Sequence, residues 1–275
     1  MNSNSKEKRQ KKNSFSFVSP AKVNLYFEVL QKRRDGYHDI TSLFHTVNFG
    51  DILSFSFAEN EHFTSNLACL KWDNTNLIYK ALKLFRRRTG HPQLFAIHLT
   101  KNIPLQAGLG GGSSNAATTL WAVNKLVGSP LKRTDLQELS KEIGSDVPFF
   151  FSNGAAICEG RGEKVYPLPQ KMELTFWVVK PDFGLCTKSV FSNFSLDHKM
   201  KSSSPFFNDL ENAAFKTEPK LFSFYENLKR QTSQVVMTGS GSCFLVFQKE
   251  KPKGNFSFVK EVSTTIRKEN HWYLL

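Results

Sequence analysis

The chain has 275 residues, of which 40% are hydrophobic and 26 are Phe, and its formal net charge is +13. This length suits one large domain or two small ones with a substantial core, and the composition excludes a disordered protein. Since no apolar run approaches about 18 residues, the sequence predicts no membrane-spanning helix. The positive charge favours anionic partners such as nucleotides, phosphate esters or nucleic acid.

Residues 1–13, MNSNSKEKRQKKN, carry part of that charge, and we predict that they form a disordered basic tail. They contain no apolar core of a secretory signal, and Glu7 argues against the alternative of an organelle transit peptide. No C-x-x-C spacing links the cysteines, which stand at positions 69, 158, 186 and 243. We therefore expect reduced, buried thiols and a location in the bacterial cytoplasm rather than in a plastid.

The first predicted elements are strands and one helix. Residues 22–30 alternate between polar and apolar, which predicts a half-buried strand with Lys22 and Asn24 side by side on its polar face. Alternation of the same kind predicts strands over 52–57 and 94–99. Residues 76–88 have apolar side chains at helical spacing, and Gly90 is expected to end that helix.

Two further helices are expected in the middle of the chain. One begins near Ser114, and the other opens at Thr134 and ends at Gly144, with Gln137 at the spacing of a capping box. Beyond this point the patterns predict a strand at 174–179, a Lys/Ser-rich loop at 197–205, a helix at 219–229 and a strand at 243–247.

The order of these elements predicts the fold class. Strands and helices are interspersed without regular alternation, which is typical of an α+β protein with two lobes. The composition changes near 166–169, YPLP, so we place the boundary there. The expected division is an N-terminal domain at 14–166 and a C-terminal domain at 167–275.

A glycine-rich stretch, IPLQAGLGGGSSNAA at 103–117, places four glycines and two serines directly before a helix. Glycine lets backbone N–H groups approach a ligand and reaches positive φ at little cost. The start of a helix adds unpaired N–H groups and the positive end of its dipole. The stretch therefore predicts a phosphate-binding loop, in which Ser113 and Ser114 cap the helix and donate to phosphate oxygens.

Three familiar phosphate loops fit this stretch less well. A Walker A loop ends in GK[ST], whereas GGSS stands here without a Lys. A dinucleotide fingerprint has a third Gly where this chain has Ser113. A protein kinase has an HRD motif, which does not occur in this sequence.

The stretch instead resembles the central motif of the GHMP small-molecule kinases, P-x-x-x-G-L-G-G-G-S-S-x-A-A. The segments SPAKVNL at 19–25 and TGSGS at 238–242 resemble the first and third motifs of that family. Three motifs in the right order over most of the chain make the resemblance specific. It implies an N-terminal lobe like ribosomal protein S5 domain 2, a ferredoxin-like C-terminal lobe and a site between them.

The resemblance also implies the cofactors and the catalytic groups. ATP, with Mg²⁺, would give its γ-phosphoryl group to an alcohol. Asp146, in SDVPFFF, would be the general base and Lys22 its charge partner, although without the resemblance they would be a turn residue and a solvated strand residue. The residues implied around the ATP phosphates are Pro104, Leu105, Gln106, Ala107, Gly108, Leu109, Gly110, Gly111, Gly112, Ser113 and Ser114.

Within the family, the segment RRDGYHDITSLFHTV at 33–47 discriminates between substrates. Its resemblance implies a substrate that carries cytosine on a diphosphate and is phosphorylated on its 2-hydroxyl group in isoprenoid precursor synthesis. Stacking on aromatic rings gives a base affinity, and hydrogen bonds to its edge give selectivity. The residues implied in substrate binding are Asn24, Tyr37, His38, Phe44, Thr187 and Phe191.

Two other interpretations explain fewer features. Another GHMP kinase, acting on homoserine, mevalonate or a sugar, has no use for an aromatic platform at 36–38. An S5-like RNA-binding protein explains the charge but neither Asp146 nor the glycine-rich stretch. We therefore expect a small-molecule substrate and neither a nucleic-acid nor a membrane partner. The sequence favours neither a monomer nor a homodimer, identifies no Mg²⁺ ligand and assigns Arg161 no role.

Overall fold

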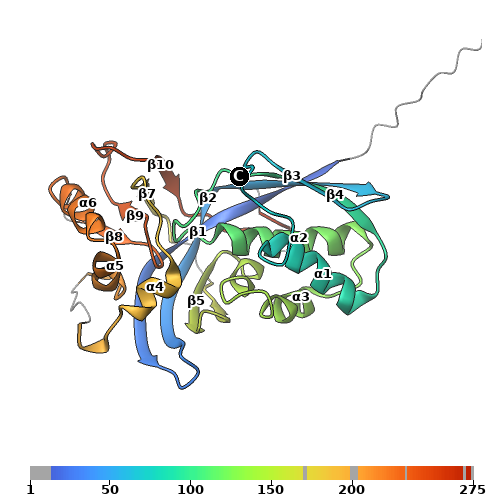
Figure 1. Ribbon diagram of the computed structural model, residues 1–275, viewed down its shortest axis with the longest axis horizontal. Coiled ribbons are helices and arrows are strands. Elements are labelled where there is room, and N and C mark those ends of the chain that lie inside the picture. Colours follow the sequence, from blue (N-terminus) through green and yellow to red (C-terminus); the bar gives the residue numbers. More distant parts are fainter. Residues whose placement is uncertain (1–13, 170–171, 199–203, 233, 269–270, 274–275) are drawn as a thin grey trace, which may run out of the picture.

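The computed structural model describes residues 14–169, 172–198, 204–232, 234–268 and 271–273. The predicted tail at 1–13 and residues 199–203 of the predicted loop lie outside the described residues. Among the described residues, a six-stranded sheet and a four-stranded sheet each carry helices and form two lobes (Figure 1). The prediction of an α+β fold with two lobes is confirmed.

The first sheet has the strand order β3-β4-β2-β5-β6, with β1 paired to β2. Its strands are β1 (Phe15–Lys32), β2 (His38–Ala58), β3 (His62–Ser65), β4 (Leu94–Thr100), β5 (Ala155–Gly160) and β6 (Lys164–Pro167). The helices of this lobe are α1 (Leu77–Thr89), α2 (Gly111–Leu126), α3 (Arg133–Ser140) and the 3-10 turn η1 (Pro148–Phe151). Their apolar side chains pack against one face of the sheet and form the first core.

The second sheet has the order β10-β7-β9-β8, and its neighbouring strands are antiparallel. Its strands are β7 (Thr175–Lys180), β8 (Val235–Met237), β9 (Phe244–Val246) and β10 (Phe258–Ser263). The helices of this lobe are α4 (Thr187–Ser192), α5 (Glu211–Thr217), α6 (Lys220–Lys229) and the 3-10 turn η2 (Leu196–His198). A second core lies between this sheet and its helices.

The ends of α1 follow local sequence signals. The Asn76 side chain accepts a hydrogen bond from the Ile78 amide at the start of the helix. Gly90 ends the helix in the left-handed conformation, with φ at 68°, as the sequence predicts. A side chain at this φ would be strained, so glycine fixes the last turn.

The ends of α2 and α3 differ from the predictions. α2 begins at Gly111 rather than Ser114, and its N-cap is Gly110 with φ at 66° and no side-chain cap, so the two serines do not cap it. α3 ends at Ser140 rather than Gly144. Its first turn is closed by Asp135, not Gln137, because the Lys132 amide donates to the Asp135 carboxylate at 3.0 Å.

The long β1–β2 hairpin belongs to both lobes (Figure 1). Val23 lies in a third core between the two sheets, and Phe27 lies farther along β1 in the core of the second lobe. The predicted half-buried strand is confirmed over 26–30, where partly exposed and buried side chains alternate. It is wrong at the start of the segment, because Lys22 and Asn24 on the polar face are only 3% and 1% exposed. Their face of β1 is covered by the first lobe, where Phe44 lies beneath the Lys22 ammonium group.

The end of the described chain returns to the first lobe. Trp272 and Tyr273 belong to the first core, although they follow the second sheet in sequence. The Trp272 indole N–H donates to the Val18 carbonyl at 2.8 Å, which ties this segment to β1. The first lobe therefore includes residues from both sides of the boundary expected near 166–169.

Two of the four cysteines do not match the expectation of buried thiols. All four are free, but only Cys158 and Cys243 are buried, whereas Cys69 and Cys186 are exposed. Cys69 lies in the segment between β3 and α1, and Cys186 is the N-cap of α4, so neither is inside a core. Within the described residues, no helix combines the length and apolar character that crossing a bilayer requires.

Candidate active site

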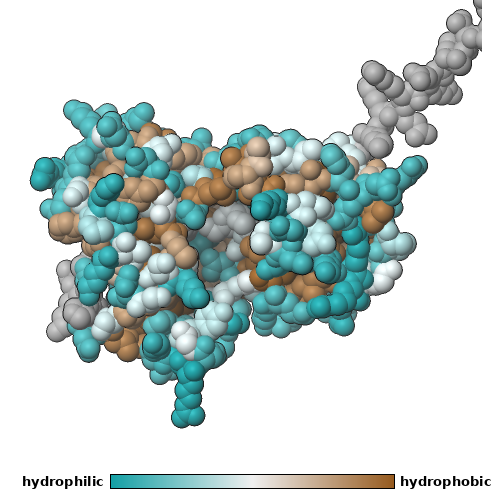
Figure 2. Space-filling model, in the orientation of Figure 1, coloured by the Kyte–Doolittle hydropathy of each residue, from teal (hydrophilic) through white to brown (hydrophobic). Residues whose placement is uncertain are grey.

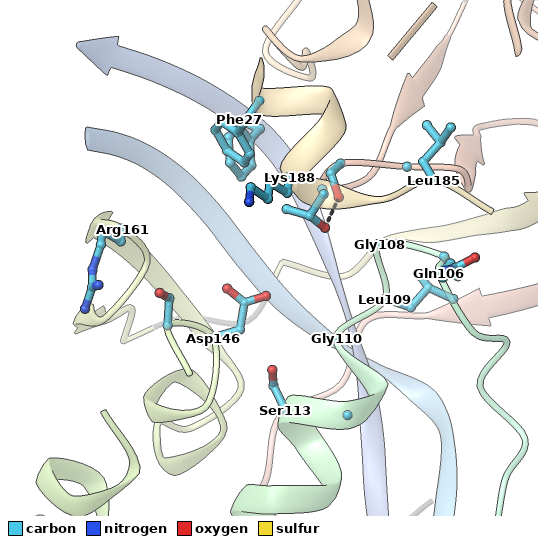
Figure 3. Close-up of a pocket in the computed structure, with 18 of the residues that line it drawn as sticks. Phe27, Gln106, Gly108, Leu109, Gly110, Ser113, Asp146, Arg161, Leu185 and Lys188 are labelled. Carbon is cyan, nitrogen blue, oxygen red and sulfur yellow. Dashed lines mark hydrogen bonds between the residues drawn. The ribbon is translucent and has the colours of Figure 1, made fainter. Parts of the chain in front are cut away.

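The glycine-rich loop leads directly into α2 and faces a cavity (Figure 3). The first amide bonded within this helix is that of Ser114, which donates to the Gly110 carbonyl at 2.9 Å. In the part of the chain that the structure describes, no carbonyl accepts from the amides of Gly111, Gly112 or Ser113. These free N–H groups at a helix start form a cradle for an anion.

Close packing explains two of the glycines in this loop. At Gly108, φ is 72° and a Cβ would overlap the Thr238 carbonyl oxygen. At Gly110, a Cβ would lie 2.7 Å from Cγ of Lys22. Glycine is therefore required where the loop touches the segments of the other two motifs.

The third motif, 238–242, lies against the glycine-rich loop and α4. The Ser242 and Cys243 amides donate to the carbonyls of Gln106 and Ala107 at 3.3 and 3.4 Å. The Ser240 hydroxyl forms a 2.7 Å hydrogen bond with that of Thr187. Three segments that are far apart in the sequence thus form one wall of the cavity.

Lys22 and Asp146 form the charged centre of the site. The Lys22 ammonium lies 3.3 Å from the Asp146 carboxylate and donates to Oδ1 of Asn24 at 2.7 Å. It also stands 4.3 Å from the centre of the Phe44 ring. Because Lys22 is buried, its charge acts on Asp146 with little screening by solvent.

The fold places Asp146 in a tight turn between α3 and η1. The Val147 amide donates to the Gly144 carbonyl at 3.2 Å, and the buried Phe149 anchors the segment that follows. The Asp146 carboxylate also lies beside the β5–β6 turn, since a Cβ on Gly162 would stand 3.3 Å from its Oδ1. In Figure 3 the Ser113 hydroxyl points from the start of α2 into the cavity, and the Asp146 carboxylate points into the same space.

Aromatic side chains gather at the other end of the cavity. The rings of His38 and Phe191 are stacked, with centroids 5.2 Å apart. Tyr37 is 56% exposed, and the Arg161 guanidinium lies 5.0 Å from the centre of its ring. Partial burial, and secondarily the charge of Lys32, lower the pKa of His38, so its ring is neutral at pH 7.

One cavity of about 1060 Å³ joins the glycine-rich loop, Asp146 and the aromatic group. It lies between the lobes, where the space-filling view shows a hollow (Figure 2). The predicted residues that line it are Lys22, Tyr37, His38, Pro104, Leu105, Gln106, Ala107, Gly108, Leu109, Gly110, Gly111, Gly112, Ser113, Asp146, Thr187 and Phe191.

Three predicted site residues do not line this cavity. Phe44 is 1% exposed and packs against Phe149 in the first core. Asn24 lies behind Lys22, where its amide donates to the Ser42 hydroxyl at 2.8 Å. Ser114 is fully buried and accepts a hydrogen bond from Ser19 at 2.9 Å. All three support residues that do line the cavity.

Asn208 is a site-supporting residue that the sequence analysis missed. Its buried amide donates to the carbonyls of Met237 and Gly239, each at 2.7 Å, and so holds the start of the third motif. Lys101 was also missed; it lines the cavity beside Gly111 and donates to the buried Asp51 at 2.7 Å. Burial lowers the pKa of Lys101, and the charge of Asp51 opposes that shift.

The residues present fit a nucleotide better than a protein-bound metal cluster. The uncovered amides at 111–113 suit phosphate oxygens. In the described residues, no group of three or more His, Cys, Asp and Glu side chains could hold a metal ion. A Mg²⁺ ion at such a site would take most of its ligands from phosphates and water.

Comparison with known proteins identifies the class of protein to which this chain belongs. The model of the GHMP kinases N terminal domain matches residues 76–154, which include the glycine-rich loop and Asp146. A solved structure of 4-(cytidine 5'-diphospho)-2C-methyl-D-erythritol kinase has a TM-score of 0.76 and 28% identity to this chain, and the match covers 91% of this chain and 99% of the other. The fold is that of a GHMP kinase.

Curated relatives narrow the class to one family. A protein from Protochlamydia amoebophila (strain UWE25), named 4-diphosphocytidyl-2-C-methyl-D-erythritol kinase, is 43% identical over 269 residues, which cover 94% of this chain and 93% of the relative. A chloroplastic/chromoplastic enzyme of that name from Solanum lycopersicum is 39% identical over 293 residues, covering 94% and 73%. The chain belongs to the 4-diphosphocytidyl-2-C-methyl-D-erythritol kinase family, as its motifs predict.

Proposed function

We propose that this kinase uses ATP to phosphorylate the 2-hydroxyl group of 4-diphosphocytidyl-2-C-methyl-D-erythritol during isoprenoid precursor synthesis. The observation that carries the proposal is one cavity with the Lys22–Asp146 pair at one end and Tyr37, His38 and Phe191 at the other. A substrate that joins a base to an alcohol through a diphosphate requires both ends of this cavity, one for the base and the other for the alcohol. The names of the curated relatives support the same substrate.

The glycine-rich loop would hold the triphosphate of ATP. The amides of Gly111, Gly112 and Ser113 would donate to phosphate oxygens, and the start of α2 adds the positive end of its dipole. Mg²⁺ would neutralise charge on the phosphates, and the Ser113 hydroxyl is an oxygen donor of this loop at the cavity. The loop thereby fixes the γ-phosphoryl group near Asp146.

Asp146 would act as the general base. Its carboxylate accepts the proton of the substrate hydroxyl as the oxygen of that group bonds to the γ-phosphorus, and ADP leaves. Lys22, which donates to Asn24 at 2.7 Å and lies 3.3 Å from Asp146, would balance the negative charge that develops nearby. Asn24 therefore contributes to the reaction through the position of Lys22.

The aromatic end would bind the cytosine. Tyr37 and Phe191 offer ring faces for stacking. His38 is neutral at pH 7, so its ring has one donor and one acceptor for the edge of a pyrimidine. Thr187 stands between this end and the third motif, with which it shares a hydrogen bond.

A panel of alcohols tests the proposal directly. Purified protein, ATP and Mg²⁺ are combined with the cytidine diphosphate-linked methylerythritol, with methylerythritol phosphate, with homoserine and with mevalonate, and ADP release is measured. We expect rapid ADP release only with the cytidyl substrate. Equal or faster turnover of an alcohol without cytosine would reject the proposed substrate.

We also propose a location in the bacterial cytoplasm. Four free cysteines suit a reducing compartment, and one of the relatives compared above is bacterial. Fractionation of the native organism, with immunodetection of the protein, tests this location. Recovery of the protein from a plastid fraction would reject it.

A further inference from the structure

The wall of the cavity carries more positive than negative charge. Its cationic side chains are Lys22, Lys32, Lys101, Arg161 and Lys188, and its acidic side chains are Asp35 and Asp146. Five positive and two negative groups give this wall a formal charge of +3. The excess favours an anionic ligand in addition to the phosphates at the glycine-rich loop.

Three of these cations already have partners within the chain. Lys22 is bound by Asn24 and Asp146. Lys101 donates to the Asp51 carboxylate and to a backbone carbonyl. Arg161 lies over the ring of Tyr37, with its Nε 3.9 Å from a Glu163 carboxylate oxygen.

Lys32 and Lys188 remain, and in the described part of the chain neither side chain has a carboxylate or carbonyl partner. Lys32 pairs with His38 in the β1–β2 ladder, so it stands at the aromatic end. Lys188 lies in the first turn of α4, on the opposite lobe. The two lysines therefore occupy different places along the cavity.

Lys188 is placed between the two ends of the cavity. It follows Thr187, which bonds to Ser240 of the third motif, and it precedes Phe191 by three residues. Side chains three positions apart lie on the same side of a helix, so Lys188 and Phe191 face the cavity together. Figure 3 shows the Lys188 side chain reaching from α4 into the space above Asp146.

We propose that Lys188 binds the diphosphate of the nucleotide-linked substrate. The inference rests on the proposed function, which puts the base at Tyr37, His38 and Phe191 and the reacting alcohol at Asp146. The diphosphate connects these groups and must cross the region that Lys188 occupies. A mobile ammonium group with three donors suits a diphosphate, and its binding neutralises a charge that the chain leaves unpaired.

The test uses Lys188→Met, which keeps the aliphatic stem and removes the charge. Lys220→Met is the matched control, because Lys220 is an exposed lysine near the start of a helix of the same lobe and lies outside the cavity. With a non-hydrolysable ATP analogue and Mg²⁺ filling the nucleotide site, calorimetry measures the affinities of CDP and of cytidine. The affinity of the analogue itself is measured in the same way.

We expect Lys188→Met to weaken CDP binding about tenfold, since a charge-assisted contact at an exposed lysine is partly screened by solvent. Cytidine and the ATP analogue should bind within about twofold of the wild type, because neither requires this ammonium group. The loss for CDP should shrink as salt is added. Lys188→Arg should restore most of the affinity, and Lys220→Met should match the wild type.

Three results would overturn the inference. They are unchanged CDP affinity in Lys188→Met, equal losses for CDP and cytidine, or a larger loss for the ATP analogue than for CDP. If the wild type phosphorylates the cytidyl substrate and Lys188→Met gives one of these results, only the role of Lys188 fails. If the wild type does not phosphorylate that substrate, the proposed function fails, and the role of Lys188 with it.

Discussion

Gly108→Ala tests whether close contact between the glycine-rich loop and the third motif sustains activity. A Cβ at this position would overlap the Thr238 carbonyl oxygen and would also lie 3.1 Å from the Thr238 carbonyl carbon and 3.2 Å from the Gly241 oxygen. All three contacts are with backbone, so no side chain can rotate away. Relief of the overlap requires the two segments to separate by on the order of 1 Å.

The expected magnitude follows from two costs. Alanine in the left-handed conformation, with φ at 72°, costs about 1–2 kcal/mol, and displacement of packed backbone costs about 1–3 kcal/mol more. The free energy of unfolding should therefore fall by about 2–5 kcal/mol. A displacement of about 1 Å at the phosphate loop should also reduce kcat/KM for ATP on the order of 10²-fold.

Urea denaturation without nucleotide measures the stability, and coupled ADP release measures the activity. Gly112→Ala is the control for the stability measurement, since a Cβ there would lie 3.4 Å from Leu77 Cδ1, an ordinary contact, and its φ is not left-handed. This variant should be at least as stable as the wild type, because alanine favours a helix more than glycine does. Wild-type stability and kcat/KM in Gly108→Ala would refute the argument.

Three further predictions concern individual side chains. Asp146→Asn should leave ATP binding nearly intact and lower kcat by on the order of 10²–10⁴-fold in the ADP-release assay; near-normal turnover would remove Asp146 from the chemistry. Burial raises the pKa of Glu211 from 4.5 to about 7, with a hydrogen bond from the Met237 amide opposing the shift. The folded protein therefore holds this proton more tightly than the unfolded chain, and the contribution of Glu211 to stability falls as pH rises from about 4.5 to about 7. Relative to Glu211→Gln, the wild type should lose on the order of 3 kcal/mol of unfolding free energy across that range, and parallel pH profiles would contradict this. Hydrogen bonds from Ser189 lower the pKa of the exposed Cys186 thiol, whereas burial raises the pKa of Cys158 and Cys243. Iodoacetamide should thus modify Cys186 before either of these two, and peptide mass spectrometry with Cys186→Ser as control would expose the opposite order.

Local chemistry made part of the fold predictable. Gly90 ends α1 where the apolar stripe of the helix stops. This helix end could be predicted because it depends only on the residues next to it in the sequence. The glycine-rich loop was likewise recognisable, because glycines before a helix have one strong physical use. The start of α2 was misplaced because Gly110 caps it through its backbone conformation rather than through a side chain.

Burial of polar residues was harder to predict. Alternation in β1 identified Lys22 and Asn24 as one face of the strand but could not indicate that the first lobe covers it. Phe44 was expected in the cavity, yet it lies one layer deeper, under the Lys22 ammonium. Asn208 acts on Met237 and Gly239, about 30 residues away, so no local pattern could indicate its role.

The hydrogen bond between Trp272 and Val18 spans 254 positions and has a consequence for biosynthesis. Multidomain proteins commonly fold one unit at a time as the polypeptide leaves the ribosome. Here the earliest-made lobe cannot complete its interior until Trp272 has also emerged. Translation must therefore pass residue 272 before the first lobe can reach its final packing, and a chaperone has that whole interval in which to engage the unfinished protein.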